Sequence, residues 1–315
     1  MSKRAFALAL FMLTGLIIGT TGCGAATTPE ATPTATRTPA PAMANTPKPP
    51  AATPTPQTTA TPTPTEAPTP DEIVVTPFPP DVNPFTGLQV ADEAQLDRIP
   101  VAIKVSNSPA VRPQSGLGSA DLVFEHFAEG GITRYTTVFY ANEPEMVGSV
   151  RSGRLVDLEI PAMYQAIFGY SGSSAGVKER IRHSDLFPDQ IAAPDFGVGE
   201  PYFYRVPQEG KAFEHTLFSD PAALRALAEE RGINERPDFP MHMAFSDLAP
   251  AGGEPVDTFE INYLVGTCTA EWEFLADSGV WGRSIAGTIH TDALTGQQIT
   301  ASNVILVLAN HVYTD

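Results

Sequence analysis

The chain has 315 residues, and its 36 acidic and 19 basic side chains give a formal net charge of −17 at pH 7. This excess of negative charge argues against binding to nucleic acid and against a polybasic attachment to anionic lipid. The two cysteines, Cys23 and Cys268, are too few for a disulfide framework or for a cysteine-rich metal site.

The N-terminus has the pattern of a bacterial lipoprotein signal. Lys3 and Arg4 precede an apolar run at residues 5–18, which is shorter than the ~20 residues that span a bilayer but suits a signal peptide. Small residues lead into Cys23, as they do in signals that are cleaved before a cysteine that carries lipid. We expect residues 1–22 to be a signal peptide and Cys23 to hold the protein on the extracytoplasmic face of the cell membrane through acyl chains such as palmitate. An ordinary secretory signal with an incidental cysteine is the alternative.

Residues 23–80 form a stretch of repeated Thr, Pro and Ala, as in "ATPTPQTTATPTPTEAPTP". Such a composition buries too little apolar surface to offset the entropy of ordering the chain. Dense proline favours an extended polyproline conformation, so we expect a disordered stalk that lifts a folded part off the membrane. A ligand for a proline-recognition module is the sharper alternative.

Residues 81–235 alternate between strand-like and helix-like patterns, which predicts a mixed α/β domain. Gly130 and Gly131 lie between two β-rich runs and predict a hairpin turn, because both residues accept positive φ. Ser219 is expected to cap the third helix through its hydroxyl. The expected strands lie at 99–107 and 166–172, and the expected helices at 155–164, at 175–183 and after residue 219.

The rest of the chain, 236–315, has the alternation of β-strands and predicts a smaller β-rich second domain. The sequence stops just after a strongly apolar segment, so we expect this domain to be incomplete. The expected strands lie at 256–265, 269–275, 280–290 and 299–313.

The predicted hairpin gathers charged residues. A two-residue turn would pair Phe127 with Arg134 and place Glu125, Glu129 and Arg134 on one face, together with Asp121. Glu125 and Glu129 are then candidate acid and base groups tuned by Arg134. The alternative is a structural network in which Arg134 only neutralises the two glutamates. A metal site is not expected, because alternate strand residues lie ~6.6 Å apart and three carboxylates would not converge.

Arginines also gather in Pro/Gly/Ser loops of this acidic chain, where a guanidinium fork suits a phosphate or a carboxylate. Loops at strand ends are where α/β folds place ligands. The alternative is that these arginines pair with nearby acids and hold the loops. The candidate ligand-binding residues are Asn107, Arg112, Arg134, Arg151, Ser152 and Arg154.

The sequence "GSSAG" matches a nucleophile elbow at Ser174, with Asp195 and His215 following in the order of a serine hydrolase. The β-rich region downstream does not supply the further strand–helix units of that fold. His215 stands in a polar loop and is a candidate acid/base or ligand-binding group. There is no P-loop and no dinucleotide fingerprint, so we expect no cofactor.

Four segments together resemble the YerB-like lipoproteins, an uncharacterised family of bacterial envelope proteins: "NPFTGLQV", "RIPVAIKVSNSPAVRPQSGLGSADLVFEHFAEGGITRYTTVFY", "VGSVRSGR" and "FEHTLF". The resemblance runs in order from about residue 83 to the end. It implies an N-terminal α/β domain, a C-terminal β-rich domain that normally continues further, and a histidine at the position of His215. It implies no established activity.

We therefore expect a lipid-anchored protein that binds an anionic envelope component, a phosphate- or carboxylate-bearing glycan, lipid or peptide, in a cleft lined by Arg and Glu. The alternatives are an envelope hydrolase or phosphoryl-group transferase that uses Glu125 or Glu129 with His215, and a non-enzymatic assembly or scaffold module.

Overall fold

The computed structural model describes residues 78–239, 243–246, 252–263 and 268–309. The expected signal peptide at 1–22, the expected lipidation site Cys23 and all but the end of the expected stalk lie outside the described residues. Residues 310–315, where the last expected strand ends, also lie outside them. Within the described ranges, no helix combines the length and the apolar character needed to cross a bilayer.

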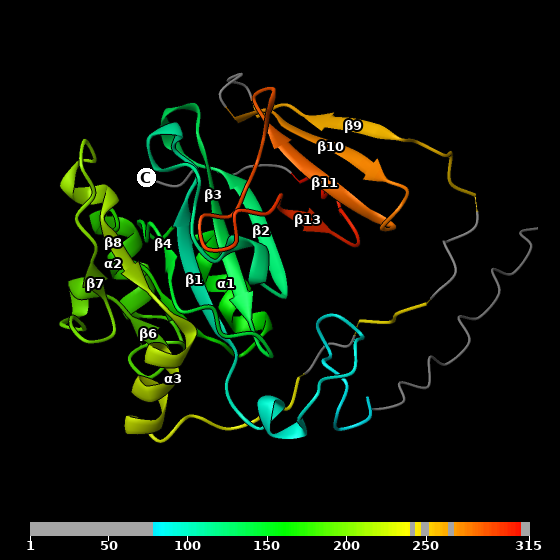
Figure 1. The fold of residues 1–315 in the computed structure, drawn as a ribbon. Helices are drawn as coiled ribbons and strands as arrows, with labels where there is room; N and C mark the ends of the chain where they lie inside the picture. Colours follow the sequence, from blue (N-terminus) through cyan, green and yellow to red (C-terminus); the bar gives the residue numbers. More distant parts are fainter. Residues whose placement is uncertain (1–77, 240–242, 247–251, 264–267, 310–315) are drawn as a thin grey trace, which may run out of the picture. The chain divides into compact units, whose positions relative to one another are not determined.

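A five-stranded sheet forms the centre of the region that the sequence predicts to be α/β (Figure 1), with the order β2–β3–β1–β5–β6. Strand β1 is antiparallel to β3 and parallel to β5. Every residue of β1 is buried, because both faces of the sheet are covered. The strands are β1 (Val101–Ser106), β2 (Leu122–Phe127), β3 (Thr133–Phe139), β5 (Ile167–Gly169) and β6 (Ile191–Ala192).

Three α-helices cover the two faces of this sheet. Ile160 of α1 and Ile181 of α2 pack in one hydrophobic cluster with Ala102 of β1. Leu224 of α3 packs in the other cluster with Ile103. The mixed α/β prediction for this region is thus confirmed in its elements, which are α1 (Val156–Met163), α2 (Ala175–Arg182) and α3 (Pro221–Glu230).

The cap of α3 differs from the one expected. Asp220 is the N-cap residue, and its Oδ1 accepts the Ala223 N–H at 2.7 Å. Ser219 instead lies in the preceding strand, where its hydroxyl donates to the Tyr202 carbonyl at 2.8 Å. A carboxylate is as good a cap as a hydroxyl, so the sequence alone did not separate the two neighbours.

A three-stranded sheet of order β4–β8–β7 and several single-turn 3₁₀ helices complete this region. The strands are β4 (Val147–Gly148), β7 (Tyr204–Arg205) and β8 (Leu217–Ser219). The 3₁₀ helices are η1 (Glu93–Leu96), η2 (Pro109–Val111), η3 (Leu117–Ser119), η4 (Glu129–Gly131), η5 (Pro194–Phe196) and η6 (Phe213–His215).

The C-terminal region is built of strands, as predicted. Its sheet has the order β12–β11–β10–β9, and β13 also pairs with β11. Trp281 packs edge-on against Phe274 of the adjacent strand and against Phe259 of the strand beyond it. The strands are β9 (Thr258–Ile261), β10 (Ala270–Leu275), β11 (Val280–Ile285), β12 (Thr288–Ile289) and β13 (Thr300–Ala301).

The strand expected at 299–313 is much shorter in the described part of the chain. Only Thr300–Ala301 pairs with β11, and residues 303–309 form no strand. Ile305 and Leu308 in this segment are 80% and 89% exposed. The apolar composition of the segment therefore does not place it in the core of the described sheet.

The hairpin between β2 and β3 has a different register from the expected one. Its turn is wider than two residues: the Ala128 N–H donates to the Ile132 carbonyl at 2.8 Å, and the 3₁₀ turn η4 lies between them. Arg134 consequently pairs with His126 instead of Phe127. A shift of one residue moves a side chain to the other face, so Glu125 and Arg134 lie on opposite faces of the hairpin.

Candidate functional site

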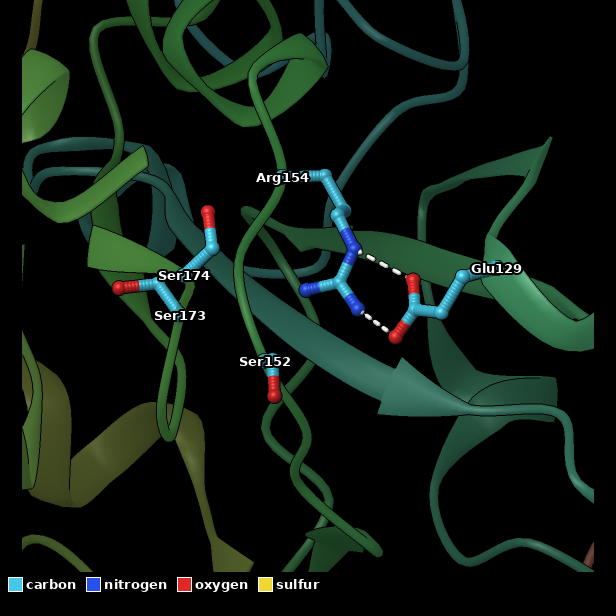
Figure 2. Close-up of a pocket in the computed structure, with 5 residues that line it drawn as sticks. All are labelled: Glu129, Ser152, Arg154, Ser173 and Ser174. Atoms are coloured by element: carbon cyan, nitrogen blue, oxygen red, sulfur yellow. Dashed lines mark hydrogen bonds and ion pairs between the residues drawn. The ribbon is translucent and has the colours of Figure 1, made fainter. Parts of the chain in front are cut away.

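A hollow of about 500 Å³ opens where three loops meet (Figure 2). Glu129 comes from the turn of the β2–β3 hairpin, and Ser152 and Arg154 come from the loop that leads into α1. Ser173 and Ser174 come from the loop between β5 and α2. We refer to the space lined by these five residues as the hollow.

The loop at residues 151–154 is held in place by backbone hydrogen bonds. The Arg151 N–H donates to the Lys104 carbonyl of β1 at 3.0 Å, and the Ser171 N–H donates to the Arg151 carbonyl at 3.0 Å. The Gly153 N–H donates to the Gly172 carbonyl at 3.0 Å. The loop thus runs between β1 and the end of β5, which fixes where Ser152 and Arg154 stand.

The carboxylate of Glu129 bridges two guanidinium groups. Its Oε2 accepts from Arg154 Nε at 2.8 Å, and its Oε1 accepts from Arg154 Nη2 and, at 2.9 Å, from Arg134 Nη2. Figure 2 shows the two-pronged contact with Arg154. These contacts, the bond from Arg154 first, lower the pKa of Glu129 to about 2, although its side chain is 63% exposed.

Arg134 reaches this carboxylate from inside the protein. The residue is 3% exposed, and its Nη1 donates to the Ser152 carbonyl at 2.9 Å. Its Nε is buried and has no hydrogen-bond partner among the described residues. Burial, with the nearby Arg154 charge, lowers the pKa of Arg134 to about 10, so the group still carries its charge at neutral pH.

A buried polar cluster supports the loop that carries Arg154. The Arg154 N–H donates to Asp157 Oδ2 at 2.6 Å, and Asp157 Oδ1 forms an ion pair with Lys104 Nζ at 2.8 Å. The Thr136 hydroxyl donates to the same Oδ1 at 2.6 Å, and Lys104 Nζ also contacts His126 Nε2. Both members of the ion pair are 0% exposed.

Burial shapes the charges of this cluster. It lowers the pKa of Lys104 to about 8 and that of His126 to about 4. Burial by itself would raise the pKa of Asp157, but the Lys104 charge and hydrogen bonds outweigh it and hold that pKa below the usual value. Lys104 is therefore a buried cation whose charge depends on Asp157.

Lys104, His126 and Asp157 are not among the site residues predicted from the sequence. A signal existed for Lys104, because it is the single charged residue in the apolar strand "IPVAIKVSN", and a buried lysine needs an anionic partner. Nothing in the sequence indicated that His126 and Asp157 would surround Lys104, since Asp157 lies 53 positions from Lys104 along the chain.

Glu125, Asn107 and Arg112 lie in a second cluster, away from the hollow. Glu125 Oε1 accepts from Asn107 Nδ2 at 3.1 Å and from the Thr133 hydroxyl at 2.6 Å. Its Oε2 accepts from Arg283 Nη2 at 2.9 Å. Arg112 donates to the side-chain and backbone oxygens of Asn107 at 3.1 and 2.7 Å. The expected single wall of Arg and Glu is therefore divided between two clusters, because of the register of the hairpin.

The second cluster ties the C-terminal strands to the central sheet. Arg283 Nε donates to His290 Nδ1 at 3.2 Å, and His290 Nε2 bonds Gln114 Oε1 at 2.7 Å. A ring nitrogen that accepts from arginine must be unprotonated. Burial, and then the charge of Arg283, lower the pKa of His290 to about 3. We call Glu125, Asn107, Arg112, Arg283, His290 and Gln114 the Glu125–Arg283 cluster.

Arg151 and His215 are not among the residues that line the hollow. Arg151 Nη1 donates to the Glu214 carbonyl at 3.0 Å. Burial, with the Arg151 charge, lowers the pKa of His215, which lies in η6. The structure thus does not bring His215 together with Glu129 in the hollow.

The nucleophile-elbow hypothesis is not supported by the contacts. Ser174 Oγ accepts the Val177 N–H at 3.3 Å and caps helix α2. Asp195 lies in η5, where its carbonyl accepts from Lys178 at 3.0 Å. No hydrogen bond in the described part of the chain joins Ser174, Asp195 and His215, so a Ser–His–Asp relay is not assembled there. Across the described ranges no cluster of three or more His, Cys, Asp or Glu side chains could hold a metal ion.

Comparisons with known proteins agree with this architecture. Residues 85–234 match the family described as "Protein of unknown function (DUF3048) N-terminal domain". The chain is 30% identical over 237 residues to the "Putative lipoprotein YerB" of Bacillus subtilis (strain 168), which covers 74% of this chain and 68% of that protein. The crystal structure of the YerB protein from Bacillus subtilis is similar with a TM-score of 0.59 and 27% identity, over 70% of this chain and 71% of that one.

Proposed function

The chain belongs to the YerB-like lipoprotein family, and we propose that it is a lipid-anchored envelope protein that binds an anionic envelope component in the hollow. The ligand would be a glycan, lipid or peptide that carries a carboxylate or a phosphate. Cys23 would hold the protein on the extracytoplasmic face of the membrane, and the Thr/Pro-rich segment would let the folded part reach the cell wall.

One observation carries this proposal: two guanidinium groups share one exposed carboxylate at the hollow. Arg134 and Arg154 both contact Glu129, which leaves one positive charge uncompensated by that acid. The site is unusual in a chain whose net charge is −17. A local excess of positive charge in an acidic protein favours an anion that comes from outside.

The serines around Arg154 support the same reading. Ser152 and Ser174 line the hollow, and their hydroxyls can donate to an anion or accept from the hydroxyl and amide groups of a glycan or peptide. Helix α2 begins directly after Ser174, so its first N–H groups lie beside the hollow and favour negative charge there. Charge and hydrogen-bonding groups are thus concentrated at the hollow.

A binding screen against envelope fragments tests the proposal. The purified protein is titrated with glycan, peptide and lipid-headgroup fragments that carry a carboxylate or a phosphate, and Arg154→Gln is compared with the wild type. Because a charge-assisted hydrogen bond is worth about 1.5–3 kcal/mol, we expect Arg154→Gln to weaken binding about tenfold or more.

Arg182→Gln is the matched control. It removes the same charge from an exposed position at the far end of α2, where Arg182 pairs with Glu179 and lies over the ring of Phe196. Equal binding by the wild type and Arg154→Gln would contradict the assignment of the hollow. Absence of binding to every anionic fragment would favour the scaffold alternative.

A further inference from the structure

Glu129 occupies the hollow in the way that a bound carboxylate would. Three guanidinium N–H groups converge on its two oxygens, two from Arg154 and one from Arg134. The pair of contacts from Arg154 is the fork arrangement that guanidinium groups form with planar carboxylates. The donors are therefore already arranged around a two-oxygen, planar anion.

The two arginines are held firmly on the protein side of this contact. Arg134 is buried in β3 and bonds the Ser152 carbonyl at 2.9 Å. Arg154 Nη1 donates to the Gly153 carbonyl at 2.7 Å, and its backbone N–H is fixed by Asp157 at 2.6 Å. A receptor fixed in this way loses little conformational entropy when it exchanges one carboxylate for another.

Glu129, in contrast, is carried by an open turn. Its side chain is 63% exposed, and it is followed by Gly130 and Gly131, both with φ of 73°. A side chain at Gly130 would meet nothing within 4 Å, so the turn has free space around it. The glycines permit backbone conformations that other residues avoid, so other conformations of the turn are sterically open to the chain.

We propose that Arg134 and Arg154 form a carboxylate receptor and that Glu129 is its intramolecular occupant, which the carboxylate of a ligand displaces. The inference rests on the proposed function and makes it narrower, because it selects carboxylates over phosphates and makes Glu129 a competitor of the ligand. With a pKa of about 2, Glu129 stays ionised throughout the neutral and mildly acidic range. Competition by another anion, and not protonation, would therefore empty the receptor.

The sign of one substitution distinguishes this device from an ordinary binding residue. If Glu129 blocks the receptor most of the time, only a small fraction of the molecules can bind the ligand. The apparent affinity is then the intrinsic affinity multiplied by this small fraction. Glu129→Ala then removes the competitor, and we expect carboxylate binding to become about tenfold tighter. A glutamate that contacted the ligand directly would have the opposite effect when removed.

The experiment is a calorimetric titration of the full chain with N-acetylmuramic acid, with acetyl-D-alanyl-D-alanine and with inorganic phosphate. The variants are Glu129→Ala, Glu129→Gln and Arg154→Lys, and Glu145→Gln removes an exposed acid elsewhere as the matched control. Thermal unfolding of each variant checks that it is folded. We expect both Glu129 variants to bind a carboxylate more tightly than the wild type, Arg154→Lys to bind it more weakly, and Glu145→Gln to be unchanged.

The contrary outcomes separate the two proposals. If Arg154→Lys weakens binding while both Glu129 variants bind equally or more weakly, the anion site stands and the competitor role of Glu129 is refuted. If the Glu129 variants gain affinity for phosphate and not for the carboxylates, the carboxylate class is wrong. If neither the wild type nor Glu129→Ala binds any of the three probes, the proposed function fails and the competitor role fails with it.

Discussion

The Lys104–Asp157 pair makes the sharpest prediction about stability, because both side chains are 0% exposed. Lys104→Met removes the cation and leaves the Asp157 carboxylate buried, with the Thr136 hydroxyl and the Arg154 N–H as its remaining donors, each at 2.6 Å. Removing one partner of a buried pair costs about 3–5 kcal/mol. Since two donors remain, we expect Lys104→Met to lower the free energy of unfolding by about 3 kcal/mol, at the lower end of this range.

The double mutant separates an ion pair from two independent polar groups. Asp157→Leu strands the ammonium of Lys104, and we expect a loss of similar size. In Lys104→Met with Asp157→Leu no buried charge is left without its partner, so the loss should fall short of the sum of the single losses by about 1–3 kcal/mol. Urea unfolding at pH 7, followed by circular dichroism and by tryptophan fluorescence, measures all four proteins.

Arg182 and Glu179 provide the control cycle. They form an exposed pair three residues apart on α2, with 50% and 58% exposed side chains. Their coupling should be at most about 0.5 kcal/mol. If the Lys104 and Asp157 losses add to within about 0.5 kcal/mol, the pair is not coupled and the account of the buried cluster is wrong.

Three further predictions concern pH, the second cluster and the anchor. His126 and His290 have pKa values of about 4 and about 3 in the folded state, below the ordinary 6.5. The unfolded chain therefore binds protons at a higher pH than the folded chain, and the free energy of unfolding decreases as the pH falls from about 6.5 toward 4. Urea unfolding at pH 7 and pH 4.5 should show this loss, and His290→Gln should reduce it. Glu125→Gln leaves the buried Arg283 without its anion, and we expect the free energy of unfolding to fall by about 2–4 kcal/mol and amide exchange in β10 and β11 to become faster, whereas unchanged exchange would contradict the tie between the sheets. Cys23→Ala should abolish labelling of the protein with palmitate, and labelling that persists in this variant would refute lipidation at this residue.

The sequence predicted the elements of the α/β region well where apolar periodicity and local signals agree. The strand at 99–107, the hairpin around Gly130 and the helices near 155–164 and 175–183 all have counterparts in the structure. Each of these segments can be identified from the apolar pattern of about ten residues, because its apolar face must pack against a core. Local patterns of this kind need no knowledge of distant contacts.

The register of the hairpin was not predictable from the same patterns. All seven residues of β3 are buried, so its residues do not alternate between a solvent-exposed face and a buried face. Such a strand gives no clue about which residue lies opposite which. The two glycines suggested a two-residue turn, but the turn is wider, because the Ala128 N–H donates to the Ile132 carbonyl. The resulting register shift of one residue places Glu125 and Arg134 on opposite faces of the hairpin.

The candidate site was predictable in part, where local sequence patterns indicate it. Ser152 and Arg154 were identified as loop residues that suit an anion, and they do line the hollow beside Glu129. Arg283 was not predicted to be part of a site, because its partner Glu125 lies 158 positions away along the chain. The sequence of a strand does not show whether an arginine in it is buried or exposed. Long-range pairing of charges is a property of the packed structure, and composition does not reveal it.

The two clusters differ in a way that separates structure from function. Glu125 and Arg283 are 12% and 3% exposed, and each finds further partners, as expected of a pair that holds two sheets together. Glu129 is largely exposed, so its contact with Arg134 contributes little to stability. Arg134 is nevertheless buried, with one N–H unsatisfied in the described structure, which is costly for folding. A chain that keeps a buried arginine opposite an exposed acid has not optimised this contact for stability, and this is the arrangement from which we propose that the hollow binds an outside anion.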